Sequence, residues 1–339
     1  MPAPLPITFC FSEDRPEVEV GVRLLVASLR RHCPGTRSVF YNAKASESLR
    51  RWLRNYPDIQ LVEERLEGAD AWNCKPHAML PLLRAGHPQV VWLDTDILLE
   101  GDPRPIFANL APEQFVVAQE PACVTNQGTD GRIKAWGEPI GRSFPFTLNS
   151  CVLRATPLHI PLLERWETWL ADERYRKWYR VPEPQPPFYA LSDQDVLNVV
   201  LACRDFSNVP VKVLKAGVDL IHSGGALVYS PRERLRGLFC PHPPMLHALA
   251  LKPWVLLDPR FDVSSRYWFF RQLLQEVSPF VAAARKYREE IEVPCPWLDF
   301  RTTPGRFVRI MGMGHWALRG LPVGLAVQFV SSWSPKLRG

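Results

Sequence analysis

The stretch VVWLDTDILL, residues 90–99, places two carboxylates directly after a run of four apolar residues. Four apolar residues in succession are typical of a strand that is buried on both faces, as in the middle of a parallel sheet. Asp94 and Asp96 follow this run, and a buried carboxylate is costly unless a cation or hydrogen-bond donors meet it. The stretch therefore predicts a central strand and a partner for negative charge at its end.

Strands and helices alternate on the N-terminal side of this stretch. We expect strands at 6–11, 38–41, 60–62 and 89–93, and helices at 17–32, 45–55 and 73–85. This alternation predicts an α/β fold with a mostly parallel central sheet and helices on both faces. Ligands of such sheets bind beyond the carboxyl ends of the strands, which is where Asp94 and Asp96 lie.

Beyond residue 100 the pattern is less regular. We expect strands at 115–118 and 148–153, helices at 157–179 and 192–202, and a loop over LLEGDP at 98–103. We also expect 264–291 to be helical, with an interruption at Pro279. There is no internal repeat and no glycine-rich phosphate loop of the G-x-G-x-x-G or G-x-x-x-x-G-K-[ST] kind. A nucleotide bound here would need another way to hold its phosphates.

Charge is unevenly distributed along the chain. The 339 residues carry 41 basic and 35 acidic side chains, and residues 301–339 hold six of the basic and none of the acidic ones. The first 300 residues are therefore balanced, which argues against nucleic acid as the main partner. The basic and aromatic tail over 301–339 suits either a peripheral membrane contact or a segment that packs on the catalytic domain, and its composition favours neither.

The cysteines and the N-terminal residues indicate the cellular compartment. The eight cysteines have no regular spacing and no C-x-x-C pair, and the opening MPAPLPITFCF has no basic leader segment. We therefore expect reduced thiols and a cytoplasmic protein. No apolar run approaches the roughly 18 residues of a transmembrane helix, so we expect at most a peripheral position on the inner face of a membrane.

The spacing of the two aspartates predicts a cation site. Residues two apart in an extended strand point to the same side, so Asp94 and Asp96 can converge on one point. Two hard oxygen donors suit Mg²⁺ or Mn²⁺, and such a cation can bridge phosphates and stabilise a departing phosphate oxygen. The alternative is that one aspartate caps the following turn while the other is solvated.

Several segments of the chain fit a known set of motifs taken in order. They are ITFCF followed by VGVRLLVASLRRHCPG, AWNCKPHAML at 71–80, WLDTDILL at 92–99, FTLNSCVL at 146–153, SDQDVLN at 192–198 and HALALKPW at 247–254. In this order they resemble the motifs of nucleotide-sugar glycosyltransferases of the GT-A fold, especially the retaining family 8 enzymes and their bacterial relatives. WLDTDILL resembles the D-x-D strand of that family, and the first two segments resemble its opening strand and helix. Together the segments cover roughly residues 6–255.

The resemblance implies roles for named residues. A divalent cation, Mn²⁺ or Mg²⁺, would be held by Asp94, Asp96 and His247. The nucleoside-diphosphate sugar would contact Lys75, Lys252, Asp94 and Thr95. The donor sugar would face Asn149, Asp193 and Gln194 near its anomeric carbon. In this arrangement one cation and two lysines, rather than a general acid, would ease departure of the leaving group.

The resemblance also implies an activity and a domain plan. The activity would be transfer of a sugar, by analogy from a UDP-sugar, to a carbohydrate, glycolipid or protein acceptor with retention of configuration. The plan would be a GT-A catalytic domain over 1–255, a helical extension over 256–300 and a basic aromatic tail over 301–339. One alternative is a sugar nucleotidyltransferase, although SEDRPEVEVG does not resemble its glycine-rich basic loop. Another is a non-catalytic sugar-binding or scaffold relative.

Several of the implied residues have structural alternatives. Ser192 and Asp195 have the spacing of a capping box at the start of a helix. His247 could be a satisfied core histidine, Lys75 an ordinary surface lysine and Asn149 a partner for backbone groups at a strand end.

The chain also departs from the family pattern. Ala250 and Cys151 stand where the family has glycine, and the loop SEDRPEVE lacks the tyrosine that packs on the base. These changes are compatible with binding of metal and diphosphate. They affect the contact with the base, so the family pattern alone does not identify which base the site accepts.

Overall fold

The computed structural model describes residues 5–69, 73–121, 128–179, 192–223, 230–249, 252–256, 276, 278–298, 322, 325, 326 and 329. The chain divides into two compact units, each made of three segments. The first unit combines residues 1–14, 35–95 and 104–215, and the second combines 15–34, 96–103 and 216–339. The division falls inside the D-x-D stretch, between Thr95 and Asp96.

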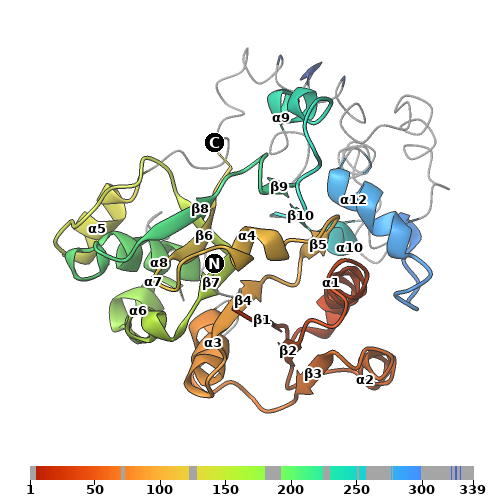
Figure 1. The fold of residues 1–339 in the computed structure, drawn as a ribbon, viewed down its shortest axis with the longest axis horizontal. Coiled ribbons are helices and arrows are strands. Elements are labelled where there is room, and N and C mark those ends of the chain that lie inside the picture. Colours follow the sequence, from red (N-terminus) through yellow and green to blue (C-terminus); the bar gives the residue numbers. More distant parts are fainter. Residues whose placement is uncertain are drawn as a thin grey trace. The chain divides into compact units, whose positions relative to one another are not determined.

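The first unit is built on a seven-stranded sheet with the order β3-β2-β1-β4-β7-β6-β8 (Figure 1). Its strands are β1 (Ile7–Ser12), β2 (Ser38–Tyr41), β3 (Ile59–Val62), β4 (Gln89–Leu93), β6 (Phe115–Gln119), β7 (Leu148–Ala155) and β8 (Val211–Leu214). β7 runs antiparallel to β4 and β6, and the other neighbouring strands are parallel. The predicted α/β fold with a mostly parallel central sheet is confirmed.

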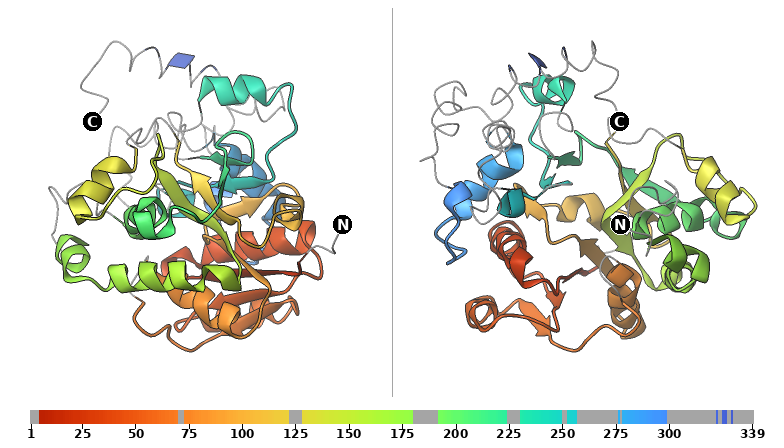
Figure 2. Two further views of the ribbon diagram at one scale, coloured as in Figure 1. Left: turned by 60° about the vertical axis from the view of Figure 1, so that its left-hand side comes forward. Right: turned by 180° about the vertical axis from the view of Figure 1, so that it is seen from behind.

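The helices of this unit are α2 (Glu47–Leu53), α3 (Cys74–Arg84), α4 (Arg104–Ala108), α5 (Asp130–Trp136), α6 (Ile160–Leu170), α7 (Glu173–Tyr179) and α8 (Asp193–Ala202). α6 packs between α3 and α8, while α3 also contacts β1 and β4 and α8 contacts β7 (Figure 2). Trp92 on β4 and Trp166 on α6 belong to the apolar core between these helices and the sheet. Trp166 and Trp169 are three residues apart on α6, so they lie on the same face of the helix, and both are buried in this core.

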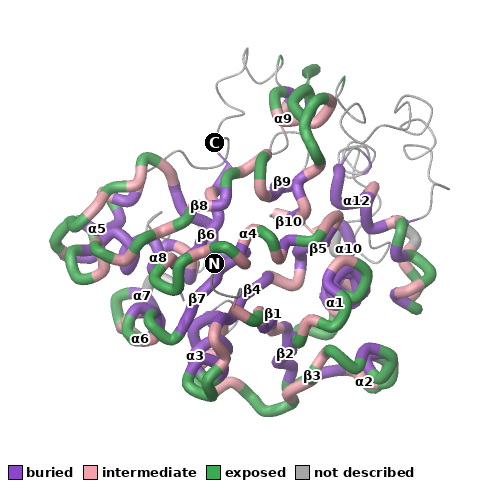
Figure 3. The backbone as a smooth tube through the Cα atoms, in the orientation of Figure 1, coloured by how far each residue is buried: buried purple, intermediate pink, exposed green. Residues whose placement is uncertain are grey.

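Strand β4 is buried along its whole length (Figure 3). It pairs with β1 on one side and with β7 on the other, which is the central position that the VVWL run predicts. Asp94 continues this pairing, because its backbone N–H donates to the carbonyl of Cys151 at 2.8 Å. The backbone of Asp94 is therefore fixed by the sheet.

The second unit contains a three-stranded sheet with the order β5-β10-β9. Its elements are α1 (Glu19–His32), β5 (Ile97–Leu99), β9 (Leu220–His222), α9 (Pro231–Arg236), β10 (Met245–His247), α10 (Pro253–Leu256) and α12 (Pro279–Ala284). α1 packs on β5, and the backbone N–H of Leu99 donates to the hydroxyl of Ser28 at 3.1 Å. The D-x-D stretch thus leaves a strand of the first sheet and enters a strand of the second.

Some predicted elements differ from the structure. The loop predicted at 98–103 is wrong at its start, because Leu98 and Leu99 belong to β5 and pair with β10. The helix predicted at 157–179 is three elements: a 3₁₀ turn at Pro157–His159, then α6 and α7. Most of the helix predicted before Pro279 lies outside the described residues, and α12 begins at that proline, where its fixed φ and missing N–H suit the first turn.

The C-terminal part of the domain plan stays a prediction. Boundaries near residues 255 and 300 adjoin residues that the structure does not describe, and nearly all of the tail lies outside the described part. Within the described residues, no helix has both the length and the apolar character to cross a membrane.

A buried ion pair joins α5 to α8. Arg132 Nε donates to Asp195 Oδ1 at 2.8 Å, and the two side chains are 3% and 4% exposed. The Asp195 carboxylate also accepts the backbone N–H of Ser192 at 3.1 Å, as expected for the capping box that the sequence suggests. Asp195 therefore has a structural role at the start of α8.

The pair gives a stability prediction. Arg132→Met keeps most of the aliphatic stem but leaves the Asp195 carboxylate buried without its cation, so we expect the free energy of unfolding to fall by about 3–5 kcal/mol. The matched control is Arg84→Met, which breaks the solvent-exposed pair with Glu164 and should cost less than about 1 kcal/mol. Urea titration of both variants measures the difference, and equal losses would contradict the role of the buried pair.

Candidate active site

Polar side chains gather at one edge of the first unit's sheet, where its parallel strands end. Glu13 follows β1, Asp94 follows β4 and Glu120 follows β6. Because β7 runs in the opposite direction, its first residues, including Asn149 and Ser150, lie at the same edge. This is the edge at which ligands of α/β sheets bind, as the sequence predicts.

Lys75, near the start of α3, lies among carboxylates at this edge. Its Nζ donates to Asp193 Oδ2 at 2.8 Å and to Ser150 Oγ at 2.7 Å, and lies 3.4 Å from Asp94 Oδ1. The hydroxyl of Ser150 also donates to Asp193 Oδ2, at 3.1 Å. With 6% of Lys75 exposed, the alternative of an ordinary surface lysine is wrong.

The charges in this cluster depend on one another. Burial lowers the pKa of the Lys75 ammonium, but Asp193 and Asp94 together raise it above its ordinary value. Burial raises the pKa of the Asp193 carboxyl, while Lys75 and Ser150 counter that rise. Removing Lys75 would therefore leave a buried carboxylate without its main stabilising charge.

Glu120 links two of the residues that the resemblance places near the sugar. Its Oε2 accepts a short hydrogen bond from Asn149 Nδ2 and a second from Gln194 Nε2, at 3.2 Å. Asn149 Oδ1 in turn accepts the backbone N–H of Cys151 at 2.9 Å, so part of its role is the strand-end one considered above. Glu120 is 4% exposed and fixes the orientation of both amides.

Asp94 and Thr95, the first-unit residues of the D-x-D stretch, make further contacts. Asp94 Oδ1 accepts the indole N–H of Trp92 at 2.7 Å. The hydroxyl of Thr95 donates to Glu13 Oε2 at 3.1 Å, so in this structure its side chain is directed to a carboxylate of the first loop. Asp94 is thus oriented by a core tryptophan, whereas Thr95 anchors the loop after β1.

The other half of the motif lies in the second unit. Asp96 precedes β5, and its carbonyl accepts the backbone N–H of Ala248 at 2.9 Å. Its Oδ1 lies 3.4 Å from His247 Nε2, while its Oδ2 accepts a short hydrogen bond from Lys252. Lys252 Nζ also donates to the carbonyl of Ala248, at 2.7 Å. The D-x-D segment and the H-x-x-x-x-K segment therefore meet side chain to side chain.

The structure thus gathers the implied residues into two sets. The first unit brings together Lys75, Asp94, Asn149, Asp193 and Gln194, and the second brings together Asp96, His247 and Lys252. The sequence analysis missed Glu13, Glu120 and Ser150. Glu13 and Glu120 each lie two residues beyond a predicted strand, 6–11 and 115–118, and that position was the available signal for both.

A pH-dependent prediction follows from the Lys75 cluster. In Lys75→Met the pKa of folded Asp193 rises further above the unfolded value of about 3.9. A carboxyl whose pKa is raised by folding contributes stability below its unfolded pKa and loses it as the pH rises through the folded pKa. The stability deficit of Lys75→Met should therefore grow as the pH rises above about 4, the unfolded pKa of Asp193, as thermal melts at several pH values would measure.

The control for this measurement is Lys44→Met. Lys44 pairs with Asp14 on the surface, where the side chains are 66% and 49% exposed, so its removal should give a small deficit with little dependence on pH. A Lys75→Met deficit that stays constant over the same range would contradict the account.

Comparisons with known proteins bear on the fold. No family model matches the sequence, and neither does any curated protein. A solved structure of the galactosyltransferase LgtC with donor and acceptor sugar analogs aligns over 84% of this chain and 99% of its own, with 15% identity and a TM-score of 0.50.

Two further solved structures are similar. An active-site variant of LgtC aligns over 80% of this chain and 96% of its own, with 15% identity and a TM-score of 0.47. The bifunctional glycosyltransferase WbbM, without ligands, aligns over 86% of this chain and 51% of its own, with 14% identity and a TM-score of 0.49. The alignment with the complex of LgtC shows a shared fold, and the GT-A fold predicted from the sequence is confirmed.

Proposed function

We propose that this chain is a metal-dependent glycosyltransferase that moves a sugar from a nucleoside-diphosphate sugar to an acceptor with retention of configuration. The observation that carries the proposal is the pair of charge clusters on either side of Thr95, one around the buried Lys75 and one around the buried Asp96. A diphosphate and its cation need both kinds of charge, and an α/β sheet offers them at its carboxyl edge. The fold shared with the galactosyltransferase LgtC supports the same activity.

Asp94, Asp96 and His247 would hold the cation. Asp96 Oδ1 is buried and accepts no hydrogen bond within the described residues. This is expected of an oxygen whose partner would be a bound cation. Two ligand atoms at right angles on a Mg²⁺ ion, each at about 2.1 Å, lie about 3 Å apart, close to the 3.4 Å between this oxygen and His247 Nε2. Two carboxylates and an imidazole suit Mn²⁺ or Mg²⁺. When bound, the cation would neutralise the phosphates and stabilise the departing phosphate oxygen.

The two lysines would act differently. Lys252 neutralises Asp96 in the structure, and it would turn to the diphosphate once a cation takes over that neutralisation. Its side chain is 26% exposed, so it has room to move. Lys75 would keep its place because Asp193 and Ser150 hold it in the buried cluster. It would supply a fixed positive charge near Asp94 rather than a mobile one.

The donor sugar would contact Asn149 and Gln194, whose amides Glu120 orients. Asp193 would act mainly through Lys75, because its carboxylate is 3% exposed and already accepts from Lys75 and Ser150. Neither Asp193 nor Gln194 is proposed as a nucleophile. The base of the donor would be uracil, by analogy with the family that the sequence resembles.

The acceptor would be a carbohydrate, a glycolipid or another protein. The enzyme itself would work in the cytoplasm, with a peripheral membrane contact through residues 301–339. Leu325 and Phe329, which the structure describes in this tail, are 50% and 64% exposed. Exposed apolar side chains in a segment with six basic and no acidic residues suit an anionic membrane surface.

The first test of the activity is thermal stabilisation by UDP-sugars, with and without Mn²⁺. A ligand at 100 times its Kd stabilises the folded state by about 2.7 kcal/mol, so one UDP-sugar should raise the melting temperature by a few degrees, and only with Mn²⁺. Asp94→Asn and Asp96→Asn should lose the shift, while the surface control Asp205→Asn should keep it.

Other outcomes separate the alternatives. Stabilisation by a nucleoside triphosphate alone would favour a sugar nucleotidyltransferase, and no response to any nucleotide or metal would favour a scaffold protein. If transfer is observed, NMR of the product gives its anomeric configuration, and inversion would contradict the proposed retention.

A second prediction concerns Glu120. Glu120→Ala frees the Asn149 and Gln194 amides to rotate, and loss of orientation at a reacting centre costs on the order of 10²-fold in rate. We expect kcat to fall by about 10- to 100-fold with a smaller change in the donor KM. Glu113→Ala, at an exposed position before β6, is the control. Unchanged kcat in Glu120→Ala would show that the amides need no such support.

A further inference from the structure

We infer that His222 is a positioning residue that holds the imidazole of His247 with Nε2 directed at the cation. The inference rests on the proposed function, because His247 is one of the proposed ligands. His222 is outside the motifs that the sequence analysis recognised, and its role comes from the geometry of the second unit.

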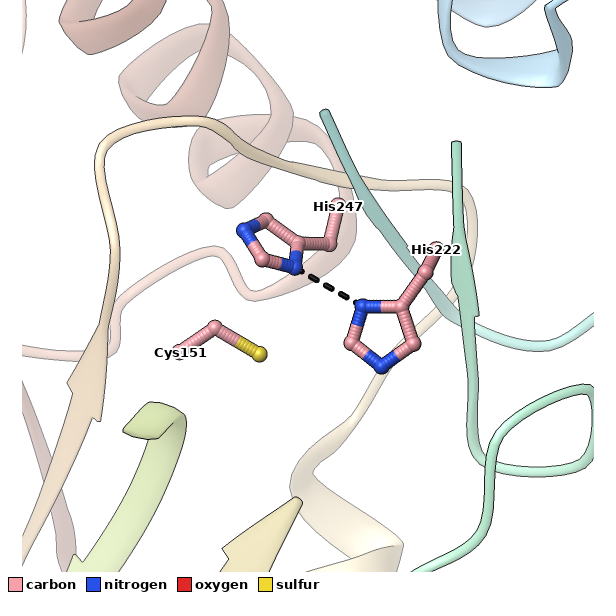
Figure 4. Close-up of side chains that lie close together, drawn as sticks. All are labelled: Cys151, His222 and His247. Atoms are coloured by element: carbon pink, nitrogen blue, oxygen red, sulfur yellow. Dashed lines mark hydrogen bonds between the residues drawn. The ribbon is translucent and has the colours of Figure 1, made fainter. Parts of the chain in front are cut away.

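The two histidines are neighbours across the second sheet. His222 ends β9 and His247 ends β10, and the register of these parallel strands pairs them directly. Residues paired in this way point to the same face of the sheet. The rings meet edge to face with centroids 5.1 Å apart, and the two Nδ1 atoms are 2.9 Å apart in a hydrogen bond (Figure 4).

This hydrogen bond constrains where the protons can be. One of the two Nδ1 atoms carries the proton and donates it, and the other accepts, because two protonated or two unprotonated nitrogens would not form a hydrogen bond. When His247 binds a cation through Nε2, its proton must sit on Nδ1, and His222 Nδ1 must then accept it. Nε2 of His247 is the atom that faces Asp96 Oδ1, at 3.4 Å. The ring nitrogen of His247 that does not bond to His222 is thus the one beside Asp96, another proposed ligand of the cation.

Burial makes the partner matter. His222 is 1% exposed and His247 is 3% exposed, so bulk water has little access to replace the contact. The backbone on both sides is already fixed, because Ser223 N–H donates to the carbonyl of His247 at 2.7 Å and Ala248 N–H donates to that of Asp96 at 2.9 Å. What the sheet leaves open is the rotation of the His247 ring and its tautomer, and His222 restricts both.

The test uses two variants of nearly equal shape. Asn places an amide oxygen close to where His222 Nδ1 lies, so His222→Asn keeps an acceptor, whereas His222→Leu removes it. Loss of such a partner typically weakens metal binding by about 10- to 100-fold. We therefore expect the Kd for Mn²⁺, measured on the full chain from the EPR signal of the free ion, to rise by that factor in His222→Leu and by less than about 3-fold in His222→Asn.

The control is His32→Leu, which removes a histidine that bonds to the hydroxyl of Tyr287 elsewhere in the same unit. It should leave the Kd for Mn²⁺ unchanged. Melting temperatures of all variants report whether each is folded, and His222→Asn keeps the test valid if His222→Leu unfolds, because a large loss in a folded His222→Asn would also contradict the inference.

A second readout needs no metal. In protein labelled with ¹⁵N-histidine, the ring nitrogen shifts give the tautomer of His247, which is assigned by its disappearance in His247→Gln. We expect His222→Leu to change this tautomer or its populations and His222→Asn to change it less.

The outcomes separate this inference from the proposed function. If the wild type binds Mn²⁺ and His222→Leu binds it equally well, the inference is wrong and the proposed metal site stands. If both His222 variants lose binding equally, an acceptor at this position is not what matters, and the inference is again wrong. If the wild type binds no Mn²⁺ while it is folded, the proposed site itself fails and the inference falls with it.

Discussion

Negative charge gathers at the end of strand β4, where Asp94 is half-buried and Asp193 is buried, and it has to be met by positive charge. This constraint governs the rest of the site. Asp94 and Asp193 both approach Lys75, which is itself buried and would be costly there without them. The three groups are supplied by β4, α8 and α3, so each fixes the position of an element as well as a charge. Apolar side chains in the same places would offer no charge to a ligand, so they could not replace this cluster.

The D-x-D stretch extends the constraint from one sheet to another. Asp94 is held by β7 and Trp92 in the first unit, and Asp96 is held in the second by Lys252, by His247 at the end of β10 and by the residue after it. Each carboxylate thus has its own support on its own sheet. Under the proposed function, a cation would be the partner that both carboxylates share, and the protein's own lysines would neutralise them when no cation is present.

The sequence predicts those parts of the fold that depend on local pattern. β4 follows from its continuous apolar run, and the start of α8 follows from the capping spacing of Ser192 and Asp195. β5 was missed because three residues carry too little pattern to be told from a loop, and pairing with β10 decides its structure. The contacts of Glu120 to Asn149 and Gln194 span 29 and 74 residues, and no local spacing contains them. The role of His222 likewise depends on the register of β9 against β10. Pairings of this kind arise only once the chain has folded.

The most direct test of the central claim is a crystal structure of the full chain grown with UDP and Mn²⁺, with anomalous diffraction collected at the manganese edge. The account predicts one strong anomalous peak within bonding distance, about 2.2 Å, of carboxylate oxygens of Asp94 and Asp96 and of His247 Nε2. It also predicts the diphosphate against the same ion, with Lys252 turned away from Asp96. A peak elsewhere, or UDP bound with Lys252 still paired to Asp96 and no metal between the aspartates, would contradict it.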